Sequence, residues 1–251
     1  MPARARIEVL VTASIPERIW DEIWELTRTY YETERAFAEG KLRESERIAL
    51  FRSGTDQSLV GMASLDTHAI EFRERPLVAI FTSHVLLRED HRGQNLVQRL
   101  GFRTFLEMRL RHPFRRIYWF FDTFSYKSYL LLARNLRSFW PRCESITPDW
   151  EQALIESLAG QIYGDAWQAS RGVVIRSGRK RLRCGTAPID PALATNPDFQ
   201  FFVQRNPGHA AGDMLVCLCP LTVRNWLGIA TRALSRARRR STLIAQPIRE
   251  M

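Results

Sequence analysis

The sequence predicts a mixed α/β fold, with a mostly antiparallel central sheet flanked by helices and a C-terminal α/β extension. Over the first 140 residues, strand-like and helix-like segments follow the order β, α, α, β, β, β, α, β, α. This order combines an antiparallel meander with one strand–helix–strand crossover. Hydrophobic residues make up 45% of the chain and charged residues 25%, a balance typical of a protein that folds around a core.

The N-terminal segments predict a strand followed by two helices. The apolar run "IEVLV" (7–11) predicts the strand. The next segment, "SIPERIWDEIWELTRTYY" (14–31), has apolar residues at helical spacing, with Ser14 as a candidate cap and Pro16 in the first turn. A second, more charged helix is expected from Glu34 to Glu46.

Three strand-like runs follow before the crossover helix. The runs "RIALFR" (47–52) and "SLVGMASL" (58–65) are separated by a turn-forming stretch, which predicts a hairpin. Residues 77–87 predict a longer strand. The crossover helix is expected to stop at Pro113 and to lead into a strand at 116–121 and a helix at 125–140.

We expect residues 1–145 to form the core and residues 146–251 an extension that completes the sheet. The extension predicts a helix at 149–161, a strand pair in "GVVIRS" and "RKRLRCG", and a proline-rich loop at 186–198. The segments "FQFFVQ" and "DMLVCLC" are predicted to be strands on either side of a long turn.

The chain is strongly basic, with 37 Lys and Arg against 27 Asp and Glu, a net charge of +10. This favours polyanionic partners such as phosphate-bearing cofactors, acidic carrier proteins, anionic membranes or nucleic acid, although no nucleic-acid motif is recognisable. No apolar stretch approaches the roughly 18 residues of a membrane span, and the N-terminus does not resemble a signal peptide. The four cysteines lack metal-ligand spacing, so we expect reduced thiols, no metal site and a cytoplasmic location.

The stretch "EDHRGQNLVQRLGF" (89–102) connects a predicted strand to a predicted helix. Unpaired amide groups and the helix dipole at such a junction can bind phosphate oxygens. Gly93 leaves room for a ligand, and Arg92 can add a bidentate contact. The alternative is an ordinary charged turn that begins a surface helix.

In its context, "VLLREDHRGQNLVQRL" (85–100) resembles the acyl-CoA signature of the GNAT acyltransferase family, Arg/Gln-x-x-Gly-x-Gly/Ala. Arg92 matches the first position, whereas Asn95 and Val97 replace the two defining glycines. The resemblance covers roughly residues 7–140. The two bulkier residues would crowd the phosphates, which leaves open a different phosphate pose, a carrier-protein donor, or a fold that has lost the activity.

The resemblance implies a binding site for acyl-CoA or for acyl-phosphopantetheine on a carrier protein. The backbone of Val85 to Leu87 would pair with the pantetheine arm. The pyrophosphate would contact five consecutive amide groups, those of Arg92, Gly93, Gln94, Asn95 and Leu96.

Acyl transfer to an amine needs a group that takes the amine proton. His84, on the strand that leads to the motif, is the candidate base, against the alternative of a half-buried structural histidine. Ser83 has the opposite strand parity, so only one of the two is expected on a given face. Asp122, at the end of a strand, could hold a cationic acceptor amine.

The family resemblance also implies a tyrosine that protonates the departing thiolate. Its expected place falls near Leu132, so that tyrosine is missing. Tyr126 and Tyr129 are candidate substitutes, and the alternative for both is packing in the core.

The segment 220–240 predicts a basic amphipathic helix for contact with a membrane surface, an acidic carrier protein or a lipid-like substrate. The leading hypothesis is an N-acyltransferase that moves an acyl group to an amine on a small molecule, lipid or peptide, with a medium or long chain preferred to acetyl. The alternative is a non-catalytic basic protein that binds nucleic acid or an anionic membrane on the same scaffold.

Overall fold

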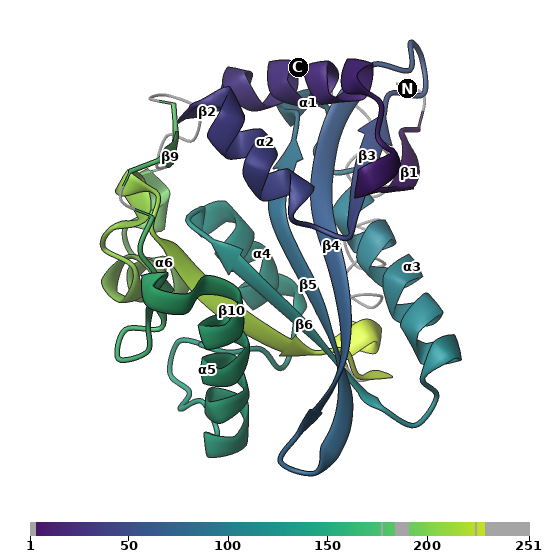
Figure 1. Cartoon of the computed structure of the whole chain (residues 1–251). Coiled ribbons are helices and arrows are strands. Elements are labelled where there is room, and N and C mark those ends of the chain that lie inside the picture. Colours follow the sequence, from purple (N-terminus) through teal and green to yellow (C-terminus); the bar gives the residue numbers. More distant parts are fainter. Residues whose placement is uncertain (1–3, 177, 184–190, 224, 229–251) are drawn as a thin grey trace, which may run out of the picture.

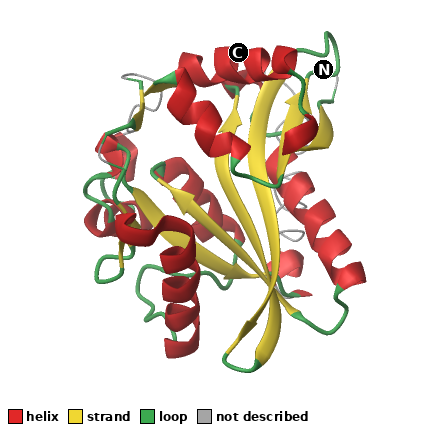
Figure 2. Cartoon of the chain, viewed as in Figure 1, coloured by secondary structure: helices red, strands yellow, loops and turns green. Residues whose placement is uncertain are grey.

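Eight strands form one sheet in the order β1-β3-β4-β5-β6-β10-β8-β7, and helices cover both of its faces (Figures 1 and 2). The structure is a computed structural model that describes residues 4–176, 178–183, 191–223 and 225–228. All the strand pairs of the sheet are antiparallel except β5 with β6. The predicted fold class is therefore confirmed.

The strands of this sheet are β1 (Arg6–Val11), β3 (Arg47–Arg52), β4 (Leu59–Phe72), β5 (Arg75–Leu87), β6 (Arg116–Thr123), β7 (Trp167–Gln168), β8 (Val173–Val174) and β10 (Met214–Pro220). A separate antiparallel pair joins β2 (Tyr31–Thr33) to β9 (Lys180–Leu182). The helices are α1 (Glu17–Tyr30), α2 (Arg35–Arg43), α3 (Leu96–Arg111), α4 (Tyr126–Asn135), α5 (Asp149–Tyr163) and α6 (Pro197–Arg205).

The alternation of apolar side chains along the strands divides the core between the two faces. On one face, α1 and α2 cover the β1–β5 half of the sheet, and α5 covers the half around β6 and β10. On the opposite face, α3, α4 and α6 pack against residues of the other strand parity. Trp20 of α1 is fully buried, and burying so large a side chain contributes about 2 to 3 kcal/mol.

The last strand in the sequence, β10, lies in the middle of the sheet between β6 and β8. Its central residues are buried on both faces, as expected for a continuous apolar run inside a sheet. Cys217 and Cys219 both lie in the cluster that packs under α4 and α6, so the two thiols share a face as the alternation predicts. Both are free thiols.

The segment "FQFFVQ" was predicted to be a strand, and this prediction is wrong. The segment is part of helix α6. Asn196 caps this helix by accepting a hydrogen bond from the Phe199 amide, and Pro197 occupies the first turn. Both are helix-starting signals that outweigh the strand propensity of the aromatic residues. Phe199 and Phe202, three residues apart, are then buried together.

Two boundary predictions also differ from the structure. Helix α1 begins at Glu17 after Pro16, and Ser14 belongs to a preceding 3-10 turn without capping the helix. Strand β4 continues to Phe72, seven residues past its predicted end. It pairs with β5 over this whole length, so pairing within the β4–β5 hairpin overrides the polar sequence there.

Candidate active site at the divergence of β5 and β6

The two parallel strands β5 and β6 pair only over part of their length. Their register runs from Leu77 with Arg116 to Thr82 with Phe121, and then ends. Beyond this point β6 pairs only with β10, and β5 continues to Leu87 paired only with β4. In the described part of the chain, the last five residues of β5 therefore have no strand partner on the β6 side.

A β-bulge lies immediately beyond this divergence. Ser83 pairs with Ser64 and Leu86 pairs with Met62, so two residues, His84 and Val85, oppose one residue of β4. His84 accordingly adopts a left-handed conformation with φ 52°. The extra residue breaks the alternation of side chains, and the expectation that Ser83 and His84 must face opposite sides is therefore wrong.

Asp122 accepts a hydrogen bond from Ser83, the residue before His84, and the positive charges of Arg176 and Lys180 act on both Asp122 and His84. The catalytic roles of Asp122 and His84 stay predictions. The Asp122 carboxylate accepts a hydrogen bond of 2.9 Å from the Ser83 hydroxyl at Oδ1, and one of 2.8 Å from the Tyr163 hydroxyl at Oδ2. Arg176 approaches Oδ2 at 4.0 Å, and the Asp122 side chain is only 3% exposed. Its two oxygens are thus already occupied by groups of this chain.

Burial is the main cause of perturbed ionisation at this carboxylate. It raises the pKa of Asp122, although Arg176 and the hydroxyl groups of Tyr163 and Ser83 act in the opposite direction. Burial and the neighbouring Asp122 carboxylate together raise the pKa of Tyr163 well above its usual value, so this hydroxyl stays a donor. Titratable groups whose pKa values are shifted by burial and by specific charged neighbours are common at functional sites.

His84 is half-buried, and its Nδ1 atom is enclosed without a hydrogen-bond partner in the described structure. Burial lowers the pKa of His84 well below its usual value, and the positive charges of Lys180, Arg176 and Lys41 lower it further. The imidazole is therefore neutral at pH 7. A neutral imidazole with an unoccupied nitrogen can accept a proton.

Three of the groups around Asp122 belong to the predicted extension, and the sequence did not identify them: Tyr163, Arg176 and Lys180. Lys180 lies on β9, and burial lowers the pKa of its amine to about 8. The Lys180 ammonium lies 4.5 Å from the centre of the Tyr31 ring. Arg176 lies between β8 and β9, and its backbone amide donates to the Asp213 carboxylate. Only long-range pairing places these residues, and one isolated Lys or Arg in a basic segment carries no local signal.

Tyr31 links this cluster to the N-terminus of α3. It packs edge-to-face against Phe124 at 5.8 Å, just beyond the end of β6. Burial raises the pKa of Tyr31 to about 12, and the positive charge of Arg92 opposes that rise. Arg92 is itself exposed and forms an ion pair with Glu89.

The turn before α3 has a backbone that suits the approach of a ligand. Gly93 has φ +88°, and a Cβ atom placed there would meet no protein atom within 4 Å. Asn95 precedes the helix in the left-handed region, and its side chain caps no amide group. The amide groups of Gly93, Gln94 and Asn95 have no hydrogen-bond partner among the described residues. A phosphate-binding helix N-terminus needs such unpaired donors.

The side chain of Gln94 has a structural contact at this junction. Its Oε1 atom accepts a hydrogen bond of 2.9 Å from the Ala5 amide. Arg99 donates to the Ala5 carbonyl, so the start of the chain is held against the first turns of α3. Leu96 is buried beneath the helix, while Val85 in the bulge is 38% exposed.

Tyr126 does not join the cluster around Asp122. It lies in the first turn of α4, buried on the opposite face of the sheet, with its ring 5.3 Å from that of Phe199. Tyr129 is also buried there, beside Phe202. A role for Tyr126 in proton transfer stays a prediction.

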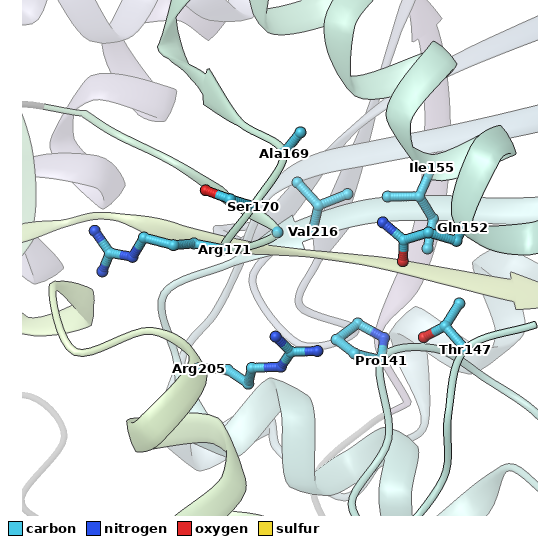
Figure 3. A pocket seen from close by; sticks show the side chains of 10 residues that line it. Pro141, Thr147, Gln152, Ile155, Ala169, Ser170, Arg171, Arg205 and Val216 are labelled. Atoms are coloured by element: carbon cyan, nitrogen blue, oxygen red, sulfur yellow. The ribbon is translucent and has the colours of Figure 1, made fainter. Parts of the chain in front are cut away.

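A pocket of about 200 Å³ lies near this site, and Figure 3 shows the side chains that line it. Its lining comes from α5, the turn at residues 169–172, Arg205 of α6, the segment after α4, and Val216 of β10. Val216 is the register partner of Asp122, so the pocket reaches the strand next to the carboxylate. Ser83, His84 and Asp122 do not line it, and we assign the candidate chemistry to the strand divergence.

Two features are absent from the described residues. No cluster of three or more histidine, cysteine or acidic side chains is arranged to hold a metal ion there. In the same part of the chain, no helix has both the length and the apolar character needed to cross a bilayer.

Comparisons with known proteins give distant likenesses in fold. No family model and no curated protein matches the sequence. One similar solved structure is N-myristoyltransferase from Saccharomyces cerevisiae with bound myristoyl-CoA, at 10% identity and a TM-score of 0.35. The match covers 47% of this chain and 31% of that one.

Two bacterial structures are similar at the same level. A probable N-acyltransferase from Enterococcus faecalis has 12% identity and a TM-score of 0.39, over 62% of this chain and 43% of that one. A GNAT family N-acetyltransferase from Escherichia coli in complex with CoA has 19% identity and a TM-score of 0.36, over 56% and 77% of the two chains. This chain thus spans less than half the length of the yeast and Enterococcus proteins.

Proposed function

We propose that this protein is an N-acyltransferase that takes an acyl group from a pantetheine thioester, on CoA or on a carrier protein, and transfers it to an amine. The observation that carries the proposal is the open edge of β5 beyond Thr82. This edge lies between the unpaired amide groups before α3 and the buried polar groups around Asp122.

The open edge suits the pantetheine arm of the donor. That arm contains two amide groups, and an unpaired strand edge offers backbone donors and acceptors to an extended ligand of this kind. Val85 and Leu87 lie on this edge. Its end leads directly to Arg92 and to the amide groups from Gly93 to Leu96, where a phosphate of the donor would bind.

The groups beside the open edge can perform the proton transfers of the reaction. The acceptor amine attacks the thioester carbonyl, a C–N bond forms and the C–S bond breaks. In our proposal, the neutral His84 takes the proton of the attacking amine. The Lys180 ammonium, whose pKa of about 8 is close to that of an ordinary thiol, returns a proton to the thiolate. Asp122 positions these groups and balances the charges of Arg176 and Lys180.

Ligand-dependent thermal stability tests the donor half of the proposal. CoA, acetyl-CoA and a series of longer acyl-CoAs are titrated against the full chain. A donor at a hundredfold its dissociation constant stabilises the protein by about 2.7 kcal/mol. The shift is expected to disappear in Gly93→Glu, which places a negative charge in the cradle. It is expected to persist in Gly101→Glu, a matched change on α3 that also meets no neighbouring atom.

Release of free thiol in the presence of an amine panel tests the transfer half. The chain-length series separates a preference for medium or long acyl groups from simple acetylation. If no acyl-CoA and no acyl carrier protein stabilises the chain, the proposal is wrong. Steeply salt-dependent binding of nucleic acid would then support the non-catalytic alternative.

A further inference from the structure

The outer side of α3 carries large apolar side chains that the fold leaves in solvent. Phe102, Leu106 and Leu110 follow one another at four-residue spacing, so they lie on one side of the helix. Their exposed fractions are 45%, 43% and 82%, and Phe114, just after the helix, is 97% exposed. We call these four residues the α3 apolar patch.

This side of α3 differs from the side that packs on the sheet. Leu100, Phe105 and Met108 of the same helix are buried in the core clusters. The helix therefore has enough apolar residues to fill its buried side, and those of the patch are additional. A contiguous exposed apolar surface on a soluble domain commonly marks an interaction site.

The segment after β10 extends this surface. The ring of Trp226 packs edge-to-face against Phe102 at a centroid distance of 5.0 Å. Asn225, 1% exposed, fixes this segment by accepting hydrogen bonds from the amide groups of Arg137 and Ser138. Val223 and Leu227, on either side of Trp226, are 70% and 60% exposed.

The surroundings of the patch are strongly basic. Residues 99–116 contain six arginines and a single acidic residue, Glu107. Glu107 already forms ion pairs with Arg47 and Arg111, so its charge is balanced. At 3.6 residues per turn, Arg103 and Arg109 lie on the two flanks of the apolar stripe.

We propose that the α3 apolar patch is a docking surface for an anionic phospholipid membrane. A helix that lies in the membrane interface needs a stripe of large apolar residues bordered by cations, and α3 has both. Leu110 and Phe114 protrude at the end of the helix, which suits insertion between lipid headgroups. A second copy of this chain would oppose the same arginines to one another, so charge disfavours self-association through this surface. The inference does not depend on the proposed chemistry.

Co-sedimentation of the full chain with vesicles tests this proposal. The wild type is expected to bind vesicles that contain phosphatidylglycerol and to bind pure phosphatidylcholine vesicles at least tenfold more weakly. Increasing salt should weaken the binding. The double variant Leu110→Glu, Phe114→Glu is expected to lose at least tenfold in affinity with an unchanged Tm, because both side chains are exposed. The single change Arg103→Gln should reduce the salt-dependent part of the binding.

A charge-matched control separates the patch from a general effect of added acid. Ile146 and Val11 are also exposed apolar residues, at 91% and 57%, and neither belongs to the patch. The double variant Val11→Glu, Ile146→Glu is expected to bind vesicles within twofold of the wild type. The proposal is overturned if the wild type does not bind anionic vesicles or binds neutral vesicles equally well. It is also overturned if the two double variants bind anionic vesicles with the same affinity. Loss of acyl carrier protein binding without loss of vesicle binding would assign the patch to a protein partner instead.

Discussion

The hydroxyl group of Ser83 donates a hydrogen bond of 2.9 Å to the Asp122 carboxylate across the point where β5 and β6 separate. The last paired residues of the two strands, Thr82 and Phe121, immediately precede them. A hydrogen bond between side chains thus connects β5 to β6 where the backbone hydrogen bonds between the two strands stop. It holds a buried carboxylate at the edge of the space between the strands, where the proposed acyl transfer would occur.

Replacement of Asp122 by asparagine is expected to separate stability from activity. The folded protein raises the pKa of this carboxyl group, so its contribution to stability is present at low pH and is lost as pH rises through the folded pKa. Relative to the wild type, Asp122→Asn should therefore gain stability from pH 4 to pH 7, measured by urea unfolding. The rate of acyl transfer should fall by roughly 10² or more, because the charges of Arg176 and Lys180 lose their counterion.

The exposed Asp56 provides a control with the opposite sign. Hydrogen bonds from Ser53 and Ser58 lower the pKa of Asp56 to about 2. Its contribution to stability is present above the unfolded pKa and is lost as pH falls. Asp56→Asn should therefore lose stability relative to the wild type as pH rises from 2 to 5, and equal pH trends for the two variants would contradict our account of Asp122.

Lys180→Met is expected to stabilise the protein at neutral pH and to impair the proposed reaction. Burial lowers the pKa of Lys180 to about 8, so the wild type gains stability relative to the variant between pH 8 and pH 10.5. That gain is on the order of 3 to 4 kcal/mol, since one pKa unit corresponds to about 1.4 kcal/mol. With acyl-CoA the variant should be slower by roughly 10², and a donor with a more acidic thiol should restore most of the rate. An equal loss with both donors would exclude proton transfer from Lys180 to the thiolate.

His84→Asn is expected to change how the free energy of unfolding depends on pH below pH 7. The pKa of His84 is lowered by burial and by three neighbouring cations, so its contribution to stability is present above the unfolded value near 6.5 and is lost as pH falls. Guanidinium unfolding between pH 5 and pH 7 should give a rising stability for the wild type relative to the variant. Asparagine tolerates the left-handed backbone of the bulge, so the comparison isolates the imidazole. A constant difference across this range would contradict a buried, neutral histidine.

Two glycine replacements near the start of α3 should have opposite effects on stability. Gly93→Ala is expected to cost about 1 kcal/mol, because φ +88° strains any residue with a Cβ atom. Gly101→Ala, inside α3, is expected to stabilise the helix by about 0.5 to 1 kcal/mol, because a Cβ atom there also meets no neighbour. Thermal unfolding of both variants measures this difference, and destabilisation by Gly101→Ala would indicate an unrecognised constraint on the helix.

The sequence predicted the fold class because periodicity, turn residues and chain breakers are local signals. It also singled out His84 and Asp122 as candidates from their places late in two recognisable strands, and their catalytic roles stay predictions. It failed for α6, where Asn196 and Pro197 begin a helix in spite of strand-forming aromatic residues. It missed the bulge at His84 and Val85, because an inserted residue changes the facing of side chains without a signature in composition.

Tyr163, Arg176 and Lys180 were beyond prediction for another reason. They lie 41 to 58 positions after Asp122 in the sequence. The packing of α5 on β10 brings Tyr163 back to Asp122, and the pairing of β8 with β10 and of β9 with β2 brings back Arg176 and Lys180. The position of Lys180 also depends on Gly212, which is distant in the sequence. Its φ of +97° lets it pack against the Lys180 carbonyl, where any side chain would collide. No local pattern in the sequence connects these two positions.

The central place of β10 has a consequence for synthesis on the ribosome. Residues 116–123 of β6 emerge early, but the strand that pairs with their open side does not emerge until residues 214–220 are made. For about ninety residues of translation, the nascent chain exposes an apolar strand edge at the position of Asp122, open to wrong partners. A chain cut short anywhere before β10 should therefore aggregate, and the site should be among the last parts of the protein to form.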